Sequence, residues 1–222
     1  MFWLAKRYQD KVSLFTDVSP WDTVSFHAGF DYVNDNYPSS EFRVQNVRSY
    51  SPSVGVIYAP LEWIKFFADY NFDYYQWNQD YNTTLKSEGK DKVNTFTLGS
   101  DVDIIKNVLG FRIQYGFSQG RSNISNNNSS TPGVQNPNWP ASWNTWQELL
   151  TRFEYQVHKN VALQLGYYFN KFSSKDYGVD IMQLWMGDFD NNNGQLRSVY
   201  LGNQFKGSYT AHIALLGLKV KF

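Results

Sequence analysis

The sequence contains no cysteine. This absence excludes disulfide bonds, thiol catalysis, cysteine zinc sites and covalent attachment of haem through a Cys-x-x-Cys-His motif. The formal net charge is zero, so no basic excess points to nucleic acid and no acidic tail is present. No run of about 18 apolar residues occurs, so this sequence offers no transmembrane helix.

Aromatic residues, in contrast, are abundant. Tyr, Phe and Trp together make up 18% of the chain, yet the mean hydropathy is −0.51. A membrane β-barrel combines these properties because its lipid-facing residues alternate with polar lumen-facing ones, and its aromatic residues gather at the two interfaces. We therefore expect an all-β protein, an antiparallel transmembrane β-barrel of the outer-membrane type.

Apolar and polar residues alternate repeatedly along the chain. A period of two places alternate side chains on opposite faces of a strand. Strong alternation covers 24–32, 64–75, 109–118, 149–157 and 161–170, and weaker alternation covers 11–18, 51–58 and 92–102. With the C-terminal segment this pattern predicts nine strands.

The C-terminal segment Ser208–Phe222 has an apolar residue at every second position back from the end. Leu216, Leu218 and Val220 share one face of the predicted strand, and the sequence ends on Phe222. Outer-membrane barrels end this way because their assembly machinery reads the last strand. We therefore interpret these four residues as an assembly signal and the barrel assembly machinery as a partner.

Four short turns are predicted between consecutive strands. Each holds only a few residues with turn-forming or polar side chains. The turns fall at Ser19–Asp22, Ala59–Glu62, Asp103–Lys106 and His158–Asn160.

Long polar connections alternate with these turns. Loops of such length are uncommon in compact domains but are the rule outside the cell in outer-membrane barrels. The pattern predicts a periplasmic C-terminus and extracellular long loops in an outer membrane. The long connections are expected at Asn34–Ser49, Asn78–Asp91, Gln119–Asn144 and Ser173–Gly207.

Residues 1–7 do not form a secretory signal, because they lack an apolar core and a cleavage site. Bacterial single-chain barrels also use even strand numbers, whereas nine strands are predicted here. We therefore expect residues 1–222 to be a single barrel domain, the C-terminal part of a larger barrel, with about nine or ten strands. Phe2–Val18 is expected to be one long strand.

Charged residues occur on the polar faces of the predicted strands. Charges that point into a dry core are costly, whereas charges that point into a wet lumen are not. They could contact a partner or select solutes, and solvated charges without a specific role remain the alternative. The lumen-facing candidates are Lys65, Asp69, Asp73, Arg112, Arg152 and Glu154.

Catalytic and metal-binding motifs are not evident. His27, His158 and His212 are the three histidines, and no two have metal-ligand spacing. Asp188–Gly194 is similar to a calcium loop, but its glycine comes one place late and the twelfth position is Val199. We expect no catalytic, cofactor-binding or metal site and no enzyme activity.

Aromatic residues are expected chiefly as anchors at the membrane interfaces. A sugar-binding row of Phe67, Tyr75 and Tyr168 in the lumen is the alternative. The expected anchors are Trp63, Trp77, Trp143, Trp146, Tyr167 and Phe169.

Four short motifs together resemble the C-terminal part of the MtrB/PioB-type decahaem-associated outer-membrane proteins. The resemblance extends over nearly the whole chain. The motifs are Arg7–Leu14 before Ser19-Pro20, Tyr58–Trp63 before Phe67–Tyr70, Asp176–Asp180 before Gly187-Asp188, and Ser198–Gly202 before Tyr209–His212.

The resemblance implies a function. Barrels of this family sheathe a periplasmic multihaem c-type cytochrome and so let electrons cross the outer membrane, while the barrel binds no haem covalently. A general diffusion porin and a soluble ligand-binding β-sandwich are the alternatives.

Overall fold

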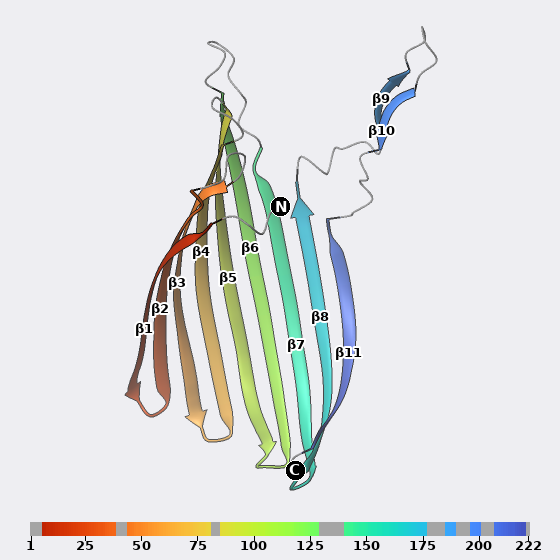
Figure 1. Cartoon of the computed structure of the whole chain (residues 1–222). Helices are drawn as coiled ribbons and strands as arrows, with labels where there is room; N and C mark the ends of the chain where they lie inside the picture. Colours follow the sequence, from red (N-terminus) through yellow and green to blue (C-terminus); the bar gives the residue numbers. More distant parts are fainter. Residues whose placement is uncertain are drawn as a thin grey trace.

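The computed structural model describes residues 6–38, 44–80, 85–128, 140–176, 185–189, 196–200 and 207–220. Nine strands in these ranges form one antiparallel sheet, and each strand pairs with its neighbour along the chain until β8 pairs with β11 (Figure 1). This confirms the nine predicted strands. They are β1 (Tyr8–Trp21), β2 (Val24–Asn36), β3 (Val44–Leu61), β4 (Ile64–Asp80), β5 (Leu85–Ile105), β6 (Leu109–Asn128), β7 (Ser142–His158), β8 (Val161–Lys175) and β11 (Tyr209–Val220).

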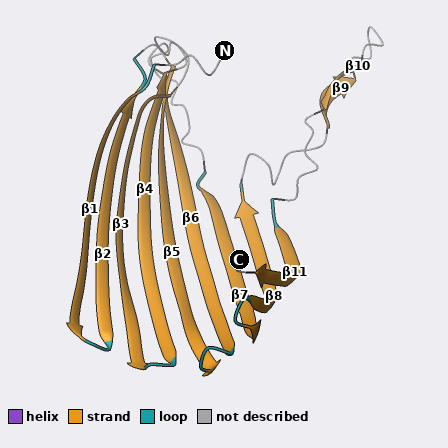
Figure 2. Ribbon diagram, turned by 60° about the horizontal axis from the view of Figure 1, so that its bottom comes forward, coloured by secondary structure: helices purple, strands orange, loops and turns teal. Residues whose placement is uncertain are grey.

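The sheet is a single curved layer that is not closed (Figure 2). Within the described residues β1 and β11 each pair on one side only. β1 begins at Tyr8, so the described part of the expected strand Phe2–Val18 is shorter at its start and runs on to Trp21, while residues 1–5 lie outside the described ranges. An incomplete barrel wall, as expected from the sequence, is what the chain forms.

One face of the sheet carries a continuous band of mostly apolar residues, and we call it the apolar face. The antiparallel register aligns the apolar positions of each strand with those of the next. One row runs across the whole sheet through Val18, Phe26, Val56, Ala68, Leu98, Tyr115, Leu149, Phe169 and His212.

Aromatic pairs strengthen this face at two heights. Tyr50 and Tyr74 stack with ring centroids 4.7 Å apart toward the outer ends of their strands, where outer means the end away from the short turns. Phe111 and Phe153 meet at 4.6 Å near the turns. Aromatic residues at two heights are typical of the two interfaces of a membrane barrel.

The opposite face, which we call the polar face, carries the residues between these positions. Its rows follow the same register, and one of them holds charged, hydroxyl and glycine residues. That row runs through Asp17, His27, Gly55, Asp69, Thr97, Gly116, Glu148, Asn170 and Ala211.

The sheet has no apolar core. Among the described residues Ala162, at 2% exposure, is the buried apolar one, whereas Leu216 is 79% exposed. A β-sandwich would cover its apolar face with a second sheet, and no second layer covers this one in the described ranges. The soluble sandwich alternative is therefore wrong, because only lipid can cover an apolar face of this extent.

The strands are longer than a membrane requires. They range from 12 residues in β11 to 21 in β5, whereas a tilted spanning strand needs about 9–11. Beyond the apolar band, polar side chains pair across the strands: the Gln76 Nε2 donates to Glu88 Oε1 at 2.6 Å.

The long connections predicted from sequence are correspondingly shorter. β2 and β3 are separated by residues 37–43, β4 and β5 by residues 81–84, and β6 and β7 by residues 129–141. The sequence misled because a strand with water on both faces is polar at every position and shows no alternation. Polar composition alone does not distinguish such a strand from a loop.

Within the fourth long connection, β9 (Trp185–Phe189) and β10 (Leu196–Tyr200) form a small antiparallel hairpin. The sequence did not predict this hairpin. Asp188 of the calcium-like motif pairs with Arg197 in its backbone register, and the remaining motif positions 190–194 lie outside the described residues.

The four short turns are confirmed, with shifts of up to a few residues. They lie at Asp22-Thr23, Glu62-Trp63, 106–108 and Lys159-Asn160. Asn107 adopts a positive φ of 60°, a conformation that asparagine tolerates better than most residues. No helix among the described residues has the length and apolarity needed to cross a membrane.

Candidate functional site

The polar face brings together all six charged residues that the sequence singled out. Three lie on β4 at every fourth position and so on one face, and the register carries their rows across β5 to β6 and β7. The residues are Lys65, Asp69, Asp73, Arg112, Arg152 and Glu154.

A row of charges lies near the short turns. Lys65, Asp101, Arg112 and Arg152 face one another in register on β4 to β7. The Arg112 Nε lies 3.5 Å from Asp101 Oδ1, and its guanidinium carbon lies 5.4 Å from the centroid of the Phe67 ring. Arg112 is thus neutralised and stacked, whereas Lys65 and Arg152 make no hydrogen bond or close ion pair within the described ranges.

Glu154 connects three strands at this end of the sheet. Its Oε2 accepts a hydrogen bond from Gln164 Nε2 at 2.7 Å, and its Oε1 lies 3.5 Å from Lys219 Nζ. β7, β8 and β11 are therefore held together by one carboxylate. Beside it, a hollow of about 320 Å³ is lined by Asp101, Arg112 and Arg152 among others.

His27 and Asp69 form the central contact of the polar face. Their Nε2 and Oδ1 atoms are 2.8 Å apart, although β3 lies between their strands. Gly55 occupies the intervening register position, and a Cβ there would collide with both side chains. The absence of a side chain at Gly55 is what lets this pair form.

A second polar cluster lies on β7 and β8. The Tyr168 hydroxyl donates to Glu148 Oε2 at 3.1 Å and accepts from Asn170 Nδ2 at 2.8 Å. Glu148 leans over Gly116 of β6, where an added Cβ would lie 2.8 Å from the Glu148 Cγ. On β4, Asp73 accepts from Asn71 Nδ2 at 2.6 Å.

Sequence reasoning missed Asp101, Glu148 and Lys219 as partners in these clusters. Strand register was the missing information. A hairpin closed near Asn107 places Asp101 opposite Arg112, so correct turn placement would have found that pair.

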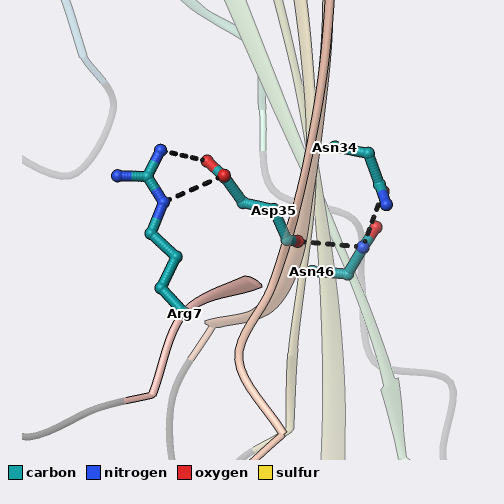
Figure 3. A network of polar contacts seen from close by, with 4 residues as sticks. All are labelled: Arg7, Asn34, Asp35 and Asn46. Atoms are coloured by element: carbon teal, nitrogen blue, oxygen red, sulfur yellow. Dashed lines mark hydrogen bonds and ion pairs between the residues drawn. The ribbon is translucent and has the colours of Figure 1, made fainter. Parts of the chain in front are cut away.

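An ion pair fixes the outer end of β2 (Figure 3). The Arg7 Nε donates to Asp35 Oδ1 at 2.9 Å and its Nη2 donates to Asp35 Oδ2 at 2.9 Å. The Asn46 Nδ2 donates to the Asp35 carbonyl oxygen at 3.0 Å and to Asn34 Oδ1 at 3.0 Å. The hydrogen bond with Asp35 raises the pKa of Arg7 above its usual value.

The three histidines lie where the sequence placed them. His27 is on the polar face, His158 ends β7 at a turn, and His212 lies near the outer end of β11 with its Nδ1 2.7 Å from the Tyr167 hydroxyl. In the part of the chain that the structure describes, no three His, Asp or Glu residues gather as a metal site.

The expected aromatic anchors divide between the two faces. Tyr167 and Phe169 lie on the apolar face, and Trp63 lies in a turn. Trp77 and Trp146 lie on the polar face, so the prediction that they anchor in lipid is wrong. Alternation in their segments is weak, which left their faces undetermined from sequence.

Phe67 and Tyr168 of the alternative sugar-binding row share one register row but lie on β4 and β8. Four strand spacings of about 4.8 Å separate them, too far to hold one sugar ring. Of the assembly-signal residues, Leu216, Leu218 and Val220 share the apolar face of β11, and Phe222 lies outside the described residues.

A curved antiparallel sheet with one apolar and one charged face is the wall of an outer-membrane β-barrel. The comparison with protein families agrees with this class. The model of the MtrB/PioB outer-membrane β-barrel porins matches residues 1–222, and the chain belongs to that family. A search of curated proteins found no match.

Solved outer-membrane proteins share the fold at low sequence identity. The copper transporter OprC aligns with a TM-score of 0.69 at 9% identity, covering 98% of this chain and 35% of OprC. The alcaligin outer-membrane receptor FauA from Bordetella pertussis gives 0.61 at 10%, covering 97% of this chain and 33% of FauA. The ferric citrate transporter FecA gives 0.59 at 11%, covering 98% and 34%. The chain thus spans about a third of the length of these barrels.

Proposed function

We propose that this chain forms one sector of the wall of an outer-membrane barrel whose lumen encloses a periplasmic multihaem c-type cytochrome. The barrel would insulate the haem chain from lipid and position it, so that electrons cross the outer membrane. Membership of the MtrB/PioB family and the resemblance in the sequence motifs support this role. The barrel itself would carry no catalytic group.

The observation that carries the proposal is the difference between the two faces. The apolar band of one face continues across nine strands and suits lipid, while the other face presents polar contacts such as His27–Asp69 and the ion pair Glu154–Lys219. A wall of this kind can contact an aqueous protein surface on one side and hydrocarbon on the other.

The sector must be completed by further strands in the membrane. Within the described residues β1 and β11 each leave one edge unpaired, and open sheet edges are not tolerated in lipid. The chain's coverage of about a third of OprC, FauA and FecA supports a larger parent barrel.

The proposed orientation follows from the connections. The short turns would face the periplasm, together with the C-terminus, and the longer connections would face outward. The apolar row of Leu216, Leu218 and Val220, with Phe222, would be read by the barrel assembly machinery.

A general diffusion porin is the second candidate, favoured by the hydrated charges Lys65 and Arg152, which lack close ion partners within the described ranges. The two functions make opposite demands on the lumen. A porin needs an open aqueous pathway, whereas a sheath needs an occupied one.

Proteoliposomes distinguish them. The parent barrel purified from its native membrane, with everything bound to it, is inserted into liposomes that contain a reduced viologen dye. A sheath is expected to carry a haem-staining partner and to oxidise the enclosed dye on addition of external ferric citrate. Ion conductance without haem or dye oxidation would contradict the proposal and support the porin.

A further inference from the structure

One sector of the polar face is not polar. On β7, β8 and β11 it carries large apolar and aromatic side chains, which we call the lumenal apolar patch. The register places them in three rows of the same face. The patch consists of Trp146, Tyr168, Phe172, Tyr209, Ile213 and Leu215.

Four side chains of the patch are exposed, and two of its aromatic rings stack, while the row of Glu148, Asn170 and Ala211 crosses the patch. Phe172 and Tyr209 stack with ring centroids 5.8 Å apart. Leu215 lies over Gly166, where an added Cβ would come within 3.4 Å of the Leu215 Cβ. Trp146, Tyr209, Ile213 and Leu215 are 39%, 54%, 44% and 46% exposed.

The same face differs elsewhere. Among the described residues of β1 to β6, Phe15 of β1 and Tyr75 of β4 are the exposed large hydrophobic side chains of the polar face, and they lie three strands apart. The row that holds Trp146 and Tyr209 continues there through Ser53, Asn71, Thr95 and Ser118. All these residues lie in one row, at the same distance from the short turns. The greater apolar exposure on β7, β8 and β11 therefore comes from the type of side chain and not from its position along the strand.

In a water-filled lumen the apolar surface of this patch would be exposed to water, which is unfavourable in free energy. Its four exposed members present on the order of 400 Å² of surface, the size at which an apolar patch on a monomer is usually a contact site. The patch is absent from the lipid side, so lipid cannot cover it. Its occupant must lie in the lumen.

The charges at the border indicate the chemistry of that occupant. Arg152 lies in the same row as Leu215, next to the patch, and makes no ion pair within the described ranges. Glu154 and Asp101 are occupied by Lys219 and Arg112, and Glu148 accepts from Tyr168. Arg152 is thus the border charge that has no hydrogen bond or close ion pair in the described ranges, although Glu154 attracts it, and as a cation it complements a carboxylate.

We propose that the lumenal apolar patch is the docking surface for the enclosed cytochrome, through a cytochrome surface that is apolar at its centre and carries a carboxylate opposite Arg152. This rests on the proposed function and deepens it, because it assigns the contact to the β7–β8–β11 sector. The β2–β6 sector then faces the cytochrome across water.

Photo-crosslinking in the parent barrel tests the assignment. Benzoyl-phenylalanine is placed at Trp146 or Ile213 and, as matched controls, at Thr95 in the row of Trp146 and at Leu216 on the opposite face. We expect a haem-staining crosslinked band from the first two positions and at least fivefold less from the controls. A stronger band from Thr95 would overturn the proposal, and so would a crosslink within the barrel chain alone.

Two variants provide a second measurement. Ile213→Ser with Leu215→Ser should lower the cytochrome retained after a high-salt wash about tenfold, whereas Thr95→Val should not. Arg152→Gln should lower retention mainly at low salt. Unchanged retention in all variants would overturn the patch assignment while the proposed function stands. If no cytochrome accompanies even the unaltered barrel, both fail.

Discussion

The Nε2 of His27 and the Oδ1 of Asp69 meet at 2.8 Å across a strand to which neither belongs. Gly55 of β3 lies between them in register, and its missing side chain leaves the space in which they meet. The pair therefore links β2 to β4 directly. The contact between β2 and β4 across β3 therefore requires that position 55 carries no side chain.

Gly55→Ala should destabilise the barrel, because the new Cβ would displace both side chains of the pair. We expect a loss of about 1–2 kcal/mol in the free energy of unfolding, measured by urea titration of the parent barrel in lipid. Gly110→Ala is the control, since its Cβ would find Asp103 Oδ1 at 3.8 Å, and alanine should be neutral or slightly stabilising there. Equal effects of the two substitutions would refute the explanation.

Substitutions of Arg112 and Arg152 should have different effects on the free energy of unfolding, although the two residues face each other in register. Arg112→Met removes the contacts with Asp101 and Phe67, and we expect a loss of about 0.5–1 kcal/mol, modest because the Arg112 side chain is 37% exposed. Arg152→Met removes a neighbour that repels Arg112 and attracts Glu154, and it removes no close ion pair, so the free energy of unfolding should change little. The same urea titration measures both, and a greater loss for Arg152→Met would contradict the assignment.

Glu154 and Lys219 should be energetically coupled across β8. A double-mutant cycle with Glu154→Gln and Lys219→Met is expected to give a coupling of about 0.5 kcal/mol, small because the Lys219 side chain is 53% exposed. The coupling should shrink as salt is raised from 0.05 M to about 1 M, where screening is strong. Additive effects at low salt would show that the contact does not form.

Arg7→Ala should loosen the outer end of the β1–β2 pair, because it leaves the Asp35 carboxylate, 11% exposed in its side chain, without its partner. Hydrogen exchange of amides near Asp35 is expected to accelerate severalfold. Adding Asp35→Asn to Arg7→Ala should reverse much of this change. Because the pKa of Arg7 is raised, its contribution should be lost only as the pH rises through that raised, strongly alkaline value.

The absence of cysteine makes the two faces directly testable. Thr97→Cys lies on the polar face and Leu98→Cys on the apolar face of the same strand. In lipid vesicles holding the parent barrel without its partner, a water-soluble maleimide should label the first at least tenfold faster. Comparable labelling of both positions would refute the assignment of the apolar face to lipid.

The amino-acid sequence determines the fold of this chain well where each strand has lipid on one side. Alternation located nine strands, and the short turns were placed to within a few residues because turn residues interrupt a regular pattern. The outer ends of β4, β5 and β6 were missed, because water on both faces removes the period-two signal.

The candidate site was predicted as a set of residues but not as a set of contacts. The alternation of side chains along a strand is enough to predict that Lys65, Asp69 and Arg112 lie on the polar face. The partners of these side chains depend on register, and the shifts between Asp103 and Ile105 and between Gln156 and His158 change it by a residue. The lumenal apolar patch was also not predicted, because apolar residues on both faces of β11 weaken the very alternation that identifies a strand.

The length of β5 has a consequence for where electrons would leave the cell. Twenty-one residues at about 3.3 Å each extend some 70 Å, which is about 50 Å in height at the usual tilt of roughly 45°, against roughly 30 Å of hydrocarbon. With the short turns in the periplasm, the excess stands above the outer leaflet as a rigid collar of paired backbone. On the proposed function, an electron acceptor would then meet the end of the haem chain at the rim of that collar, above the lipid headgroups.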